Sequence, residues 1–347
     1  MVMAYDQPLF GRRLRRAGGH RIPVVIVTGF LGAGKTTLIK RLLDNPDVSK
    51  TAVIVNEFGE VGLDDRLLRM STETTVLLDR GCLCCTVRSD LQQTLRDLLH
   101  DRSGGQLPSF DRIVIETSGL ADPGPILQTF LGDQGLAKEL YLLAVICVVD
   151  AAILSARPLS SAPEGVKQLA LADRIVVSKR DLIGDVDFEA VLNGVRAVNP
   201  SAPIALADNG AIDPQFLLDD SGQQLARTTF FAEPVEHLPD IETFSIAFDE
   251  PLTWTSFAWA MDTLRAHRGA DILRVKGLLN IKGCEGPVLV HYVQHLAHPP
   301  MELDRWPAGN QRSHLVFITR GLKRPAVLSL LTSIQDVALS EERAPAS

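Results

Sequence analysis

Apolar and polar positions follow two patterns along this chain, and the first extends from Pro23 to about Leu206. Here short runs rich in Val, Ile and Leu alternate with longer segments whose composition suits helices. The runs are continuous instead of alternating with polar residues, which is typical of parallel strands buried on both faces. The predicted strands are Val24 to Thr28, Ala52 to Asn56, Arg112 to Glu116, Ala144 to Asp150 and Arg174 to Ser178. This order predicts an α/β fold, a doubly wound and mostly parallel sheet with helices on both faces.

The second pattern follows a polar stretch, Ala207 to Pro239, whose many turn residues are typical of a linker. Beyond it the apolar positions predict a smaller α+β domain. Its predicted strands are Glu242 to Phe248, Ile272 to Lys282, Val288 to Gln294 and His314 to Thr319, and its predicted helices are Trp254 to Ala266 and Ala326 to Ile334. Five apolar residues of the first helix recur at helical spacing, and we interpret them as a stripe facing the core rather than as a ligand site. They are Trp254, Phe257, Ala258, Met261 and Leu264.

These patterns divide the chain into four predicted parts. An α/β domain covers residues 22–235 and a small α+β domain covers residues 236–338, with flexible tails at residues 1–21 and 339–347. The first tail is basic between Gly11 and Arg16. Because this basic stretch is short and precedes the first strand, we interpret it as a solvated tail rather than as a site for an anionic partner.

Charge and hydropathy argue against several classes of function. The formal net charge of the 347 residues is -7, whereas domains that grip a nucleic-acid backbone usually carry a basic excess. No apolar stretch has the length of a membrane span, and the N-terminus lacks the basic and apolar segments of a signal peptide. We therefore expect a cytoplasmic protein that binds neither nucleic acid nor membranes.

A glycine-rich segment, G-F-L-G-A-G-K-T-T, lies between the first predicted strand and a helix-like run, Leu38 to Leu43. Glycines allow the backbone to form a nest of N–H groups around phosphate oxygens, and the following helix adds its positive end. Lys35 supplies a cation for the β- and γ-phosphates, and Thr36 offers a hydroxyl to Mg²⁺. The predicted nucleotide contacts of this loop are Gly29, Gly32, Ala33, Gly34, Lys35, Thr36 and Thr37.

A strand end supplies the predicted catalytic part of a nucleotide site. The buried strand that ends at Glu116 places an acid for the metal and the N–H of Gly119 near the γ-phosphate, so the predicted catalytic residues are Lys35, Glu116 and Gly119.

A second strand end supplies the predicted base contacts. The segment there resembles the guanine-reading N-K-x-D box, in which the aspartate accepts hydrogen bonds from the base, and it reads Ser178-Lys179-Arg180-Asp181. Ser178, Lys179 and Asp181 are therefore predicted base contacts. Ser178 replaces the usual asparagine, which leaves the preference for GTP over ATP less strictly defined.

Three cysteines gather in Gly81-Cys82-Leu83-Cys84-Cys85. Thiolates this close can share one ion, and they favour Zn²⁺ or Cu(I) over Mg²⁺. The fourth ligand is water, a group of a substrate protein, or the carboxylate of Glu57 or Glu60. Because C-x-C-C is not a diagnostic zinc spacing, buried or redox-active cysteines remain the alternative.

The other cysteines and the clustered histidines stay outside this predicted metal site. Cys147 lies in an apolar run and is interpreted as a small buried hydrophobe, and Cys284 stands alone in a glycine-rich turn. We interpret His291, His295 and His298 as ordinary surface histidines rather than as a second ion site, with the first two at the end of a strand.

Taken together, these segments resemble the CobW-like GTPases, a family of proposed metallochaperones with a phosphate-loop domain and a small C-terminal domain. The matching segments are Thr28 to Thr37, Asn56 to Gly62, Gly81 to Cys85, Glu116 to Pro123 and Ser178 to Asp181. In the C-terminal part, Leu273 to Gly277, Trp306-Pro307 and Leu315 to Ile318 look like the second domain of the family.

The resemblance implies Mg²⁺-dependent hydrolysis of GTP to GDP and phosphate, with Asn56 to Gly62 as a switch segment. It also implies that Cys82, Cys84 and Cys85 bind Zn²⁺, or Co²⁺, for delivery to a client metalloprotein. It does not name the client, and it leaves open whether the chain forms a homo-oligomer. Two other functions remain open, a P-loop ATPase or kinase with structural cysteines and a non-enzymatic, nucleotide-dependent metal sensor or scaffold.

Overall fold

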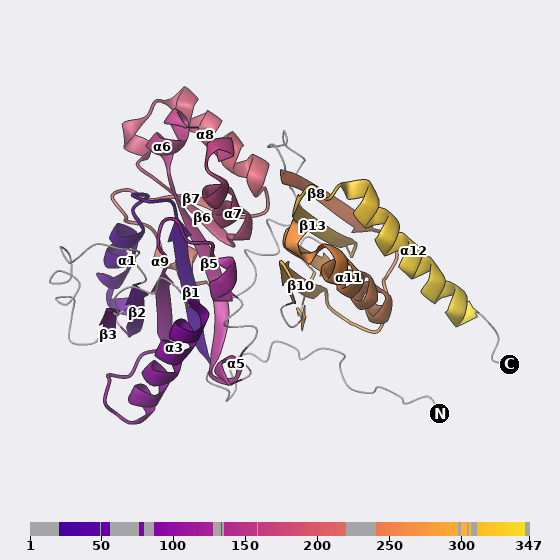
Figure 1. Cartoon of the computed structure of the whole chain (residues 1–347), viewed down its shortest axis with the longest axis horizontal. Helices are drawn as coiled ribbons and strands as arrows, with labels where there is room; N and C mark the ends of the chain where they lie inside the picture. The colour runs from indigo at the N-terminus through magenta and orange to yellow at the C-terminus, as the bar shows by residue number, and fades with distance from the viewer. Residues whose placement is uncertain are drawn as a thin grey trace. The chain divides into compact units, whose positions relative to one another are not determined.

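The computed structural model describes most of the chain. It covers residues 21–48, 50–55, 76–79, 87–127, 133, 135–157, 159–219, 241–297, 300–303, 305–306 and 311–343. These residues form two compact units, one mainly of residues 21–195 and 202–219 and the other mainly of residues 241–343 (Figure 1). The predicted boundary at residue 235 lies outside the described residues and stays a prediction.

The N-terminal unit is built on a seven-stranded sheet whose pairs are all parallel. The strand order is β3-β2-β4-β1-β5-β6-β7. The strands are β1 Ile22–Gly29, β2 Thr51–Val55, β3 Val76–Asp79, β4 Arg112–Glu116, β5 Leu140–Asp150, β6 Arg174–Ser178 and β7 Ile204–Leu206. The helices are α1 Lys35–Leu43, α3 Val87–Ser103, α5 Leu136–Glu139, α6 Ala151–Ala156, α7 Pro163–Leu171, α8 Asp185–Val198 and α9 Pro214–Leu218, with short 3-10 turns η1 Pro46–Val48, η2 Leu159–Ser161 and η3 Arg180–Leu182.

Alternate residues of the central strands pack on opposite faces of this sheet. Val25 and Val27 of β1 belong to a core cluster with apolar residues of α1 and with Leu217 of α9. The residues between them, Val24 and Ile26, are also fully buried. Burial on both faces explains why these strands read as continuous apolar runs in the sequence.

All five strands predicted for this unit are present, and β4 and β6 have the predicted bounds. The sequence analysis did not predict two further strands. β3 and β7 lie at the two edges of the sheet and contain four and three residues. Runs this short carry little periodicity, so the sequence signal is weak where the sheet ends.

The C-terminal unit is an antiparallel sheet in the order β11-β10-β9-β13-β8, with β12 paired to β10. Its strands are β8 Ile241–Phe248, β9 Ile272–Leu279, β10 Val288–Val293, β11 Leu296–Ala297, β12 Met301–Glu302 and β13 Ser313–Arg320. Its helices are α11 Trp254–Arg268 and α12 Arg324–Arg343, with a 3-10 turn η4 Gly269–Asp271. The predicted α+β architecture is therefore confirmed, with the two-residue strands β11 and β12 as additions.

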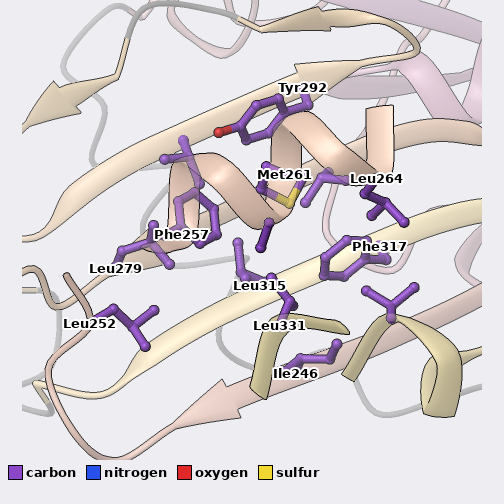
Figure 2. Close-up of a cluster of buried hydrophobic side chains, with 14 of the residues drawn as sticks. Ile246, Leu252, Phe257, Met261, Leu264, Leu279, Tyr292, Leu315, Phe317 and Leu331 are labelled. Carbon is purple, nitrogen blue, oxygen red and sulfur yellow. The ribbon is translucent and has the colours of Figure 1, made fainter. Parts of the chain in front are cut away.

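One apolar core joins the sheet to both helices of this unit (Figure 2). Phe257, Met261 and Leu264 of α11 face it as predicted. Trp254 packs at the margin of this core. The predicted stripe included Ala258, which is only half-buried, and it omitted Ala260, which is fully buried. Within the described residues, none of the helices combines the length and the apolar character needed to cross a lipid bilayer.

Phe317 of β13 is the residue whose truncation should weaken this core most. It is fully buried and stacks on Phe244 of β8 with 5.2 Å between ring centroids. We expect Phe317→Ala to lower the free energy of unfolding of the C-terminal unit by about 3–5 kcal/mol, because it leaves a cavity. Native-state hydrogen exchange of the β9 and β13 amides in the full chain measures this change.

Trp259 of α11 is the matched control, because its side chain is 57% exposed. Trp259→Ala should change the free energy of unfolding obtained from the same exchange rates by no more than about 0.5 kcal/mol. Equal effects of the two substitutions would contradict the proposed core.

Candidate functional site

The loop between β1 and α1 is shaped by three glycines with positive φ. The φ values are 139° at Gly29, 76° at Gly32 and 96° at Gly34, a region that side chains disfavour. A Cβ on Gly29 would lie 2.1 Å from the carbonyl oxygen of Val148, so only glycine fits there. Gly34 caps α1 without a side-chain hydrogen bond. The loop therefore presents backbone N–H groups and the start of a helix to an anion.

Lys35 is folded across this loop. Its side chain is buried, and Nζ donates hydrogen bonds to the carbonyl oxygens of Gly29 at 2.9 Å and Phe30 at 3.2 Å. The ammonium group thus lies over the backbone nest, where it adds positive charge for phosphate oxygens.

Thr36 and Glu116 meet beside the loop although 80 positions separate them in the sequence. Thr36 Oγ1 donates a hydrogen bond of 2.7 Å to Glu116 Oε1, which joins the first turn of α1 to the end of β4. Glu116 is buried. A hydroxyl and a carboxylate are hard oxygen donors, so this pair fits a magnesium ion better than a thiophilic one.

The segment after β4 is pressed against the phosphate loop. Thr117 N–H donates to the carbonyl oxygen of Val27 at 2.9 Å, and a Cβ on Gly119 would lie 2.5 Å from the backbone nitrogen of Leu31. Among the hydrogen bonds of the described residues, none uses the N–H of Gly119. Within the described residues, Gly119 therefore has an N–H without a hydrogen-bond partner, and it lies next to the predicted phosphate site.

The end of β6 contacts the loop from the other side. Ser178 Oγ can donate a hydrogen bond to either of two carbonyl oxygens, that of Ala33 at 2.7 Å and that of Val149 at 3.1 Å. Lys179 has a φ of 56°, and its Nζ donates to Gly32 O at 2.9 Å and pairs with Asp150 Oδ2 at 2.6 Å. Both residues therefore support the loop directly.

Asp181, the predicted reader of the base, lies next to these residues in the turn η3. It is exposed, and no hydrogen bond of its carboxylate is found among the described residues. Its neighbour Arg180 is held elsewhere, with its guanidinium carbon 4.4 Å from the ring centroid of Phe188 and an ion pair to Asp185. The carboxylate of Asp181 is therefore available to a ligand.

A turn that the sequence analysis assigned to a linker also borders the site. Asp208 and Ala211 exchange two backbone hydrogen bonds, and the positive φ values of Asn209 and Gly210 are typical of a type I′ turn. A Cβ on Gly210 would lie 2.9 Å from the carbonyl oxygen of Thr37. The interpretation of the residues from Ala207 as a linker was wrong for this segment. The Asn-Gly pair was the signal that could have shown the turn.

Several predicted residues lie outside the described residues. They are Cys82, Cys84, Cys85, Glu57, Glu60, the remainder of the segment Asn56 to Gly62, and His298. Their roles therefore remain predictions. In the part of the chain that the structure describes, no group of three His, Cys, Asp or Glu side chains is arranged to hold a metal ion.

The remaining cysteines and histidines can be placed. Cys147 is buried in β5, as predicted, and burial raises the pKa of its thiol to about 12. Cys284 is half-buried, and burial raises its pKa as well. His295 is exposed, whereas His291 is half-buried within β10 opposite Lys276, not at the end of the strand as predicted.

Two protein families match this chain. The nucleotide-binding domain of the CobW/HypB/UreG family matches residues 23–205. The C-terminal domain of the cobalamin synthesis protein cobW matches residues 241–335. The two matches coincide with the parallel and antiparallel sheets described above.

Individual relatives resemble the chain over most of its length. It is 34% identical over 309 residues to the zinc chaperone YjiA of Escherichia coli, with 88% of this chain and 95% of that protein covered. It is 30% identical to the zinc chaperone CobW of a Sinorhizobium species, with 92% and 99% covered. The crystal structure of Zn(II)-bound YjiA GTPase matches with a TM-score of 0.70 at 30% identity, covering 90% of this chain and 99% of that one.

These matches have the same order of domains as the structure, and they extend through both of its units. The chain therefore belongs to the CobW/HypB/UreG family, with the P-loop GTPase fold of the nucleotide-binding domain followed by the CobW C-terminal domain.

Proposed function

We propose that this protein hydrolyses GTP and uses the difference between its nucleotide states to bind and release Zn²⁺ for a client metalloprotein. The observation that carries the proposal is the contact between Thr36 and Glu116 beside the phosphate loop. Relatives named zinc chaperones, and a zinc-regulated GTPase metalloprotein activator of Saccharomyces cerevisiae that is 28% identical, support the metal part.

The phosphate chemistry rests on residues that already surround the loop. Thr36 and Glu116 would hold Mg²⁺, which when bound neutralises charge on the β- and γ-phosphates. Lys35 adds a second positive charge, and the free N–H of Gly119 donates to an oxygen of the terminal phosphoryl group. Water then displaces GDP from that group, and phosphate is released.

Base selection rests mainly on Asp181. Its carboxylate accepts two hydrogen bonds from the edge of guanine, whereas adenine would leave it facing an acceptor. Ser178 has one hydroxyl hydrogen, and in the structure the carbonyl oxygens of Ala33 and Val149 compete for it. Ser178 therefore supports the loop and does not read the base, and the GTP preference depends on Asp181.

The metal part of the proposal assigns Cys82, Cys84 and Cys85 to Zn²⁺ or Co²⁺ as cargo, with Glu57 or Glu60 as a further ligand. β2 ends at Val55 and β3 at Asp79, in parallel register beside Glu116. The two described strands that precede the predicted metal segments in the sequence therefore end at the edge of the sheet that carries the phosphate site. This supports coupling between nucleotide and metal.

Two alternatives make different predictions. A P-loop ATPase or kinase with structural cysteines would bind ATP as well as GTP. A nucleotide-dependent sensor or scaffold would bind GTP without releasing phosphate faster than the uncatalysed rate. The exposed carboxylate of Asp181 and the donors around the terminal phosphoryl position favour GTP hydrolysis. We further propose that the protein acts in the cytoplasm.

Replacing Asp181 tests the base assignment. Asp181→Asn converts one acceptor into a donor, so the affinity for GDP should fall about 100-fold while that for ADP stays the same. Competition of GDP and ADP against a fluorescent guanine nucleotide measures both affinities. Asp185→Asn, at an exposed neighbouring carboxylate, is the control and should leave both unchanged. An unaltered GDP affinity in Asp181→Asn would refute the assignment.

Replacing Glu116 tests the magnesium site. Glu116→Gln keeps the shape but removes the charge, so the Mg²⁺ concentration for half-maximal phosphate release should rise about tenfold and kcat should fall about 100-fold. Phosphate release over a Mg²⁺ titration measures both. Glu139→Gln, at an exposed residue of α5, should match the wild type. A normal Mg²⁺ dependence in Glu116→Gln would exclude this role.

Metal binding should depend on the cysteine cluster and on the nucleotide. The wild type should bind about one Zn²⁺ per chain, and a Cys82/Cys84/Cys85→Ser variant should lose it. Between GDP and a non-hydrolysable GTP analogue, the Zn²⁺ affinity should differ at least tenfold, about 1.4 kcal/mol. Cys284→Ser serves as the control and should bind normally. Equal affinities in the two nucleotide states would remove the coupling and leave only metal binding.

A further inference from the structure

Gln168 of α7 makes contacts that no motif in the sequence indicates. Its side chain is completely buried, and Nε2 donates hydrogen bonds to the carbonyl oxygens of Gly119 at 3.2 Å and Ala121 at 3.1 Å. A side-chain amide has two N–H groups, so both are used. The opposite orientation of the amide would place its oxygen against two carbonyl oxygens, so the contacts determine the orientation.

The two acceptors belong to the tight turn that follows β4. Ala121 N–H donates to the carbonyl oxygen of Ser118 at 3.1 Å, which closes a turn over residues 118–121. The N–H of Gly119 belongs to the same planar peptide as this carbonyl group and therefore points the opposite way. Holding the turn consequently sets the direction of the Gly119 N–H.

The turn is held from two sides. On one side Gly119 lies so close to Leu31 of the phosphate loop that a Cβ would not fit. On the other side α7 supplies Gln168 and, one residue earlier, Lys167, whose Nζ lies 3.2 Å from Asp122 Oδ2. The ion pair is about one-third exposed and contributes little, so the buried amide is the stronger of the two contacts from α7. At the start of the turn, Thr117 Oγ1 also donates to the carbonyl oxygen of Ser118 at 3.3 Å.

We propose that Gln168 is a positioning residue that holds the turn over residues 118–121 so that the N–H of Gly119 faces the terminal phosphoryl group of the bound nucleotide. The inference rests on the proposed GTP hydrolysis. GDP lacks that phosphoryl group, so Gln168 affects the binding of the triphosphate and the hydrolysis step, and it leaves the binding of GDP unchanged.

The first test compares Gln168→Met with Gln93→Met in the full chain. Methionine has nearly the same size as glutamine but no donor, and Gln93 is an exposed residue of α3. For Gln168→Met we expect about tenfold weaker binding of a non-hydrolysable GTP analogue, a kcat lowered about tenfold, and GDP binding within about twofold of the wild type. Gln93→Met should match the wild type in all three. Equal losses for GDP and the analogue, or no loss for either, would overturn the proposal.

Hydrogen exchange supplies a readout that does not depend on hydrolysis. Without nucleotide, the amide of Ala121 should exchange at least about tenfold faster in Gln168→Met than in the wild type, because the turn has lost its anchor. An unchanged rate would show that Gln168 does not hold the turn.

A second variant keeps the proposal testable if Gln168→Met does not fold. In Gln168→Glu, a deprotonated carboxylate would face two carbonyl oxygens, so burial and these neighbours raise its pKa. The protonated form can donate one hydrogen bond. The affinity for the GTP analogue, relative to the wild type, should therefore recover as the pH falls from 8 to 6. A pH-independent ratio would contradict the assigned role.

Phosphate release by the wild type distinguishes a failure of the proposed GTP hydrolysis from a failure of the role assigned to Gln168. If the wild type releases no phosphate from GTP above the uncatalysed rate, the proposed function fails whatever the variants do. If the wild type hydrolyses GTP and Gln168→Met behaves like it in binding, turnover and exchange, only the role of Gln168 fails.

Discussion

The parallel pairing of the central strands is the constraint on which the site depends. Because β1, β4, β5 and β6 run in the same direction, the residues at their carboxyl ends meet at one edge of the sheet. Glu116 pairs with Val27, and Ser178 pairs with Asp150. Residues that are far apart in the sequence therefore surround a single loop. The hydrogen bond from Thr36 to Glu116 is one result of this arrangement.

Close backbone approaches turn this edge into a cradle of defined shape. Gly29 lies against Val148 of β5, and Gly119 lies against Leu31 within the loop itself. Each contact brings main chain next to main chain without a side chain between them. Donors of the backbone are then held in place before a ligand arrives, which lowers the reorganisation needed to stabilise charge on a phosphoryl group. Gln168 extends the same principle to the turn after β4.

Ser178 shows how one substitution separates two tasks. An asparagine at this position has enough donors and acceptors to contact both the loop and a base, whereas a serine hydroxyl has a single hydrogen. In this chain that hydrogen faces the carbonyl oxygens of Ala33 and Val149. The loop keeps its support, and our proposal assigns recognition of the base to Asp181. In the proposed function, the preference for GTP therefore depends on the exposed carboxylate of Asp181.

The sequence by itself determined the fold class, the five central strands of the N-terminal unit and the phosphate loop. It could do so because strands buried on both faces leave long apolar runs, and because a phosphate nest needs glycines at set spacings. It also predicted that Glu116 at a strand end and Gly119 just after it lie beside this loop, which is where the structure has them, while their roles stay predictions.

Only the tertiary structure decided which residues lie close together. The short edge strands β3 and β7 carry too few residues for a pattern, and the half-buried place of His291 opposite Lys276 depends on strand register. Gln168 belongs to none of the sequence motifs, and α7 also contains the polar residues Glu164 and Lys167, so nothing in the sequence distinguishes it. Its partners are 47 and 49 positions away, so its role exists only once the chain has folded.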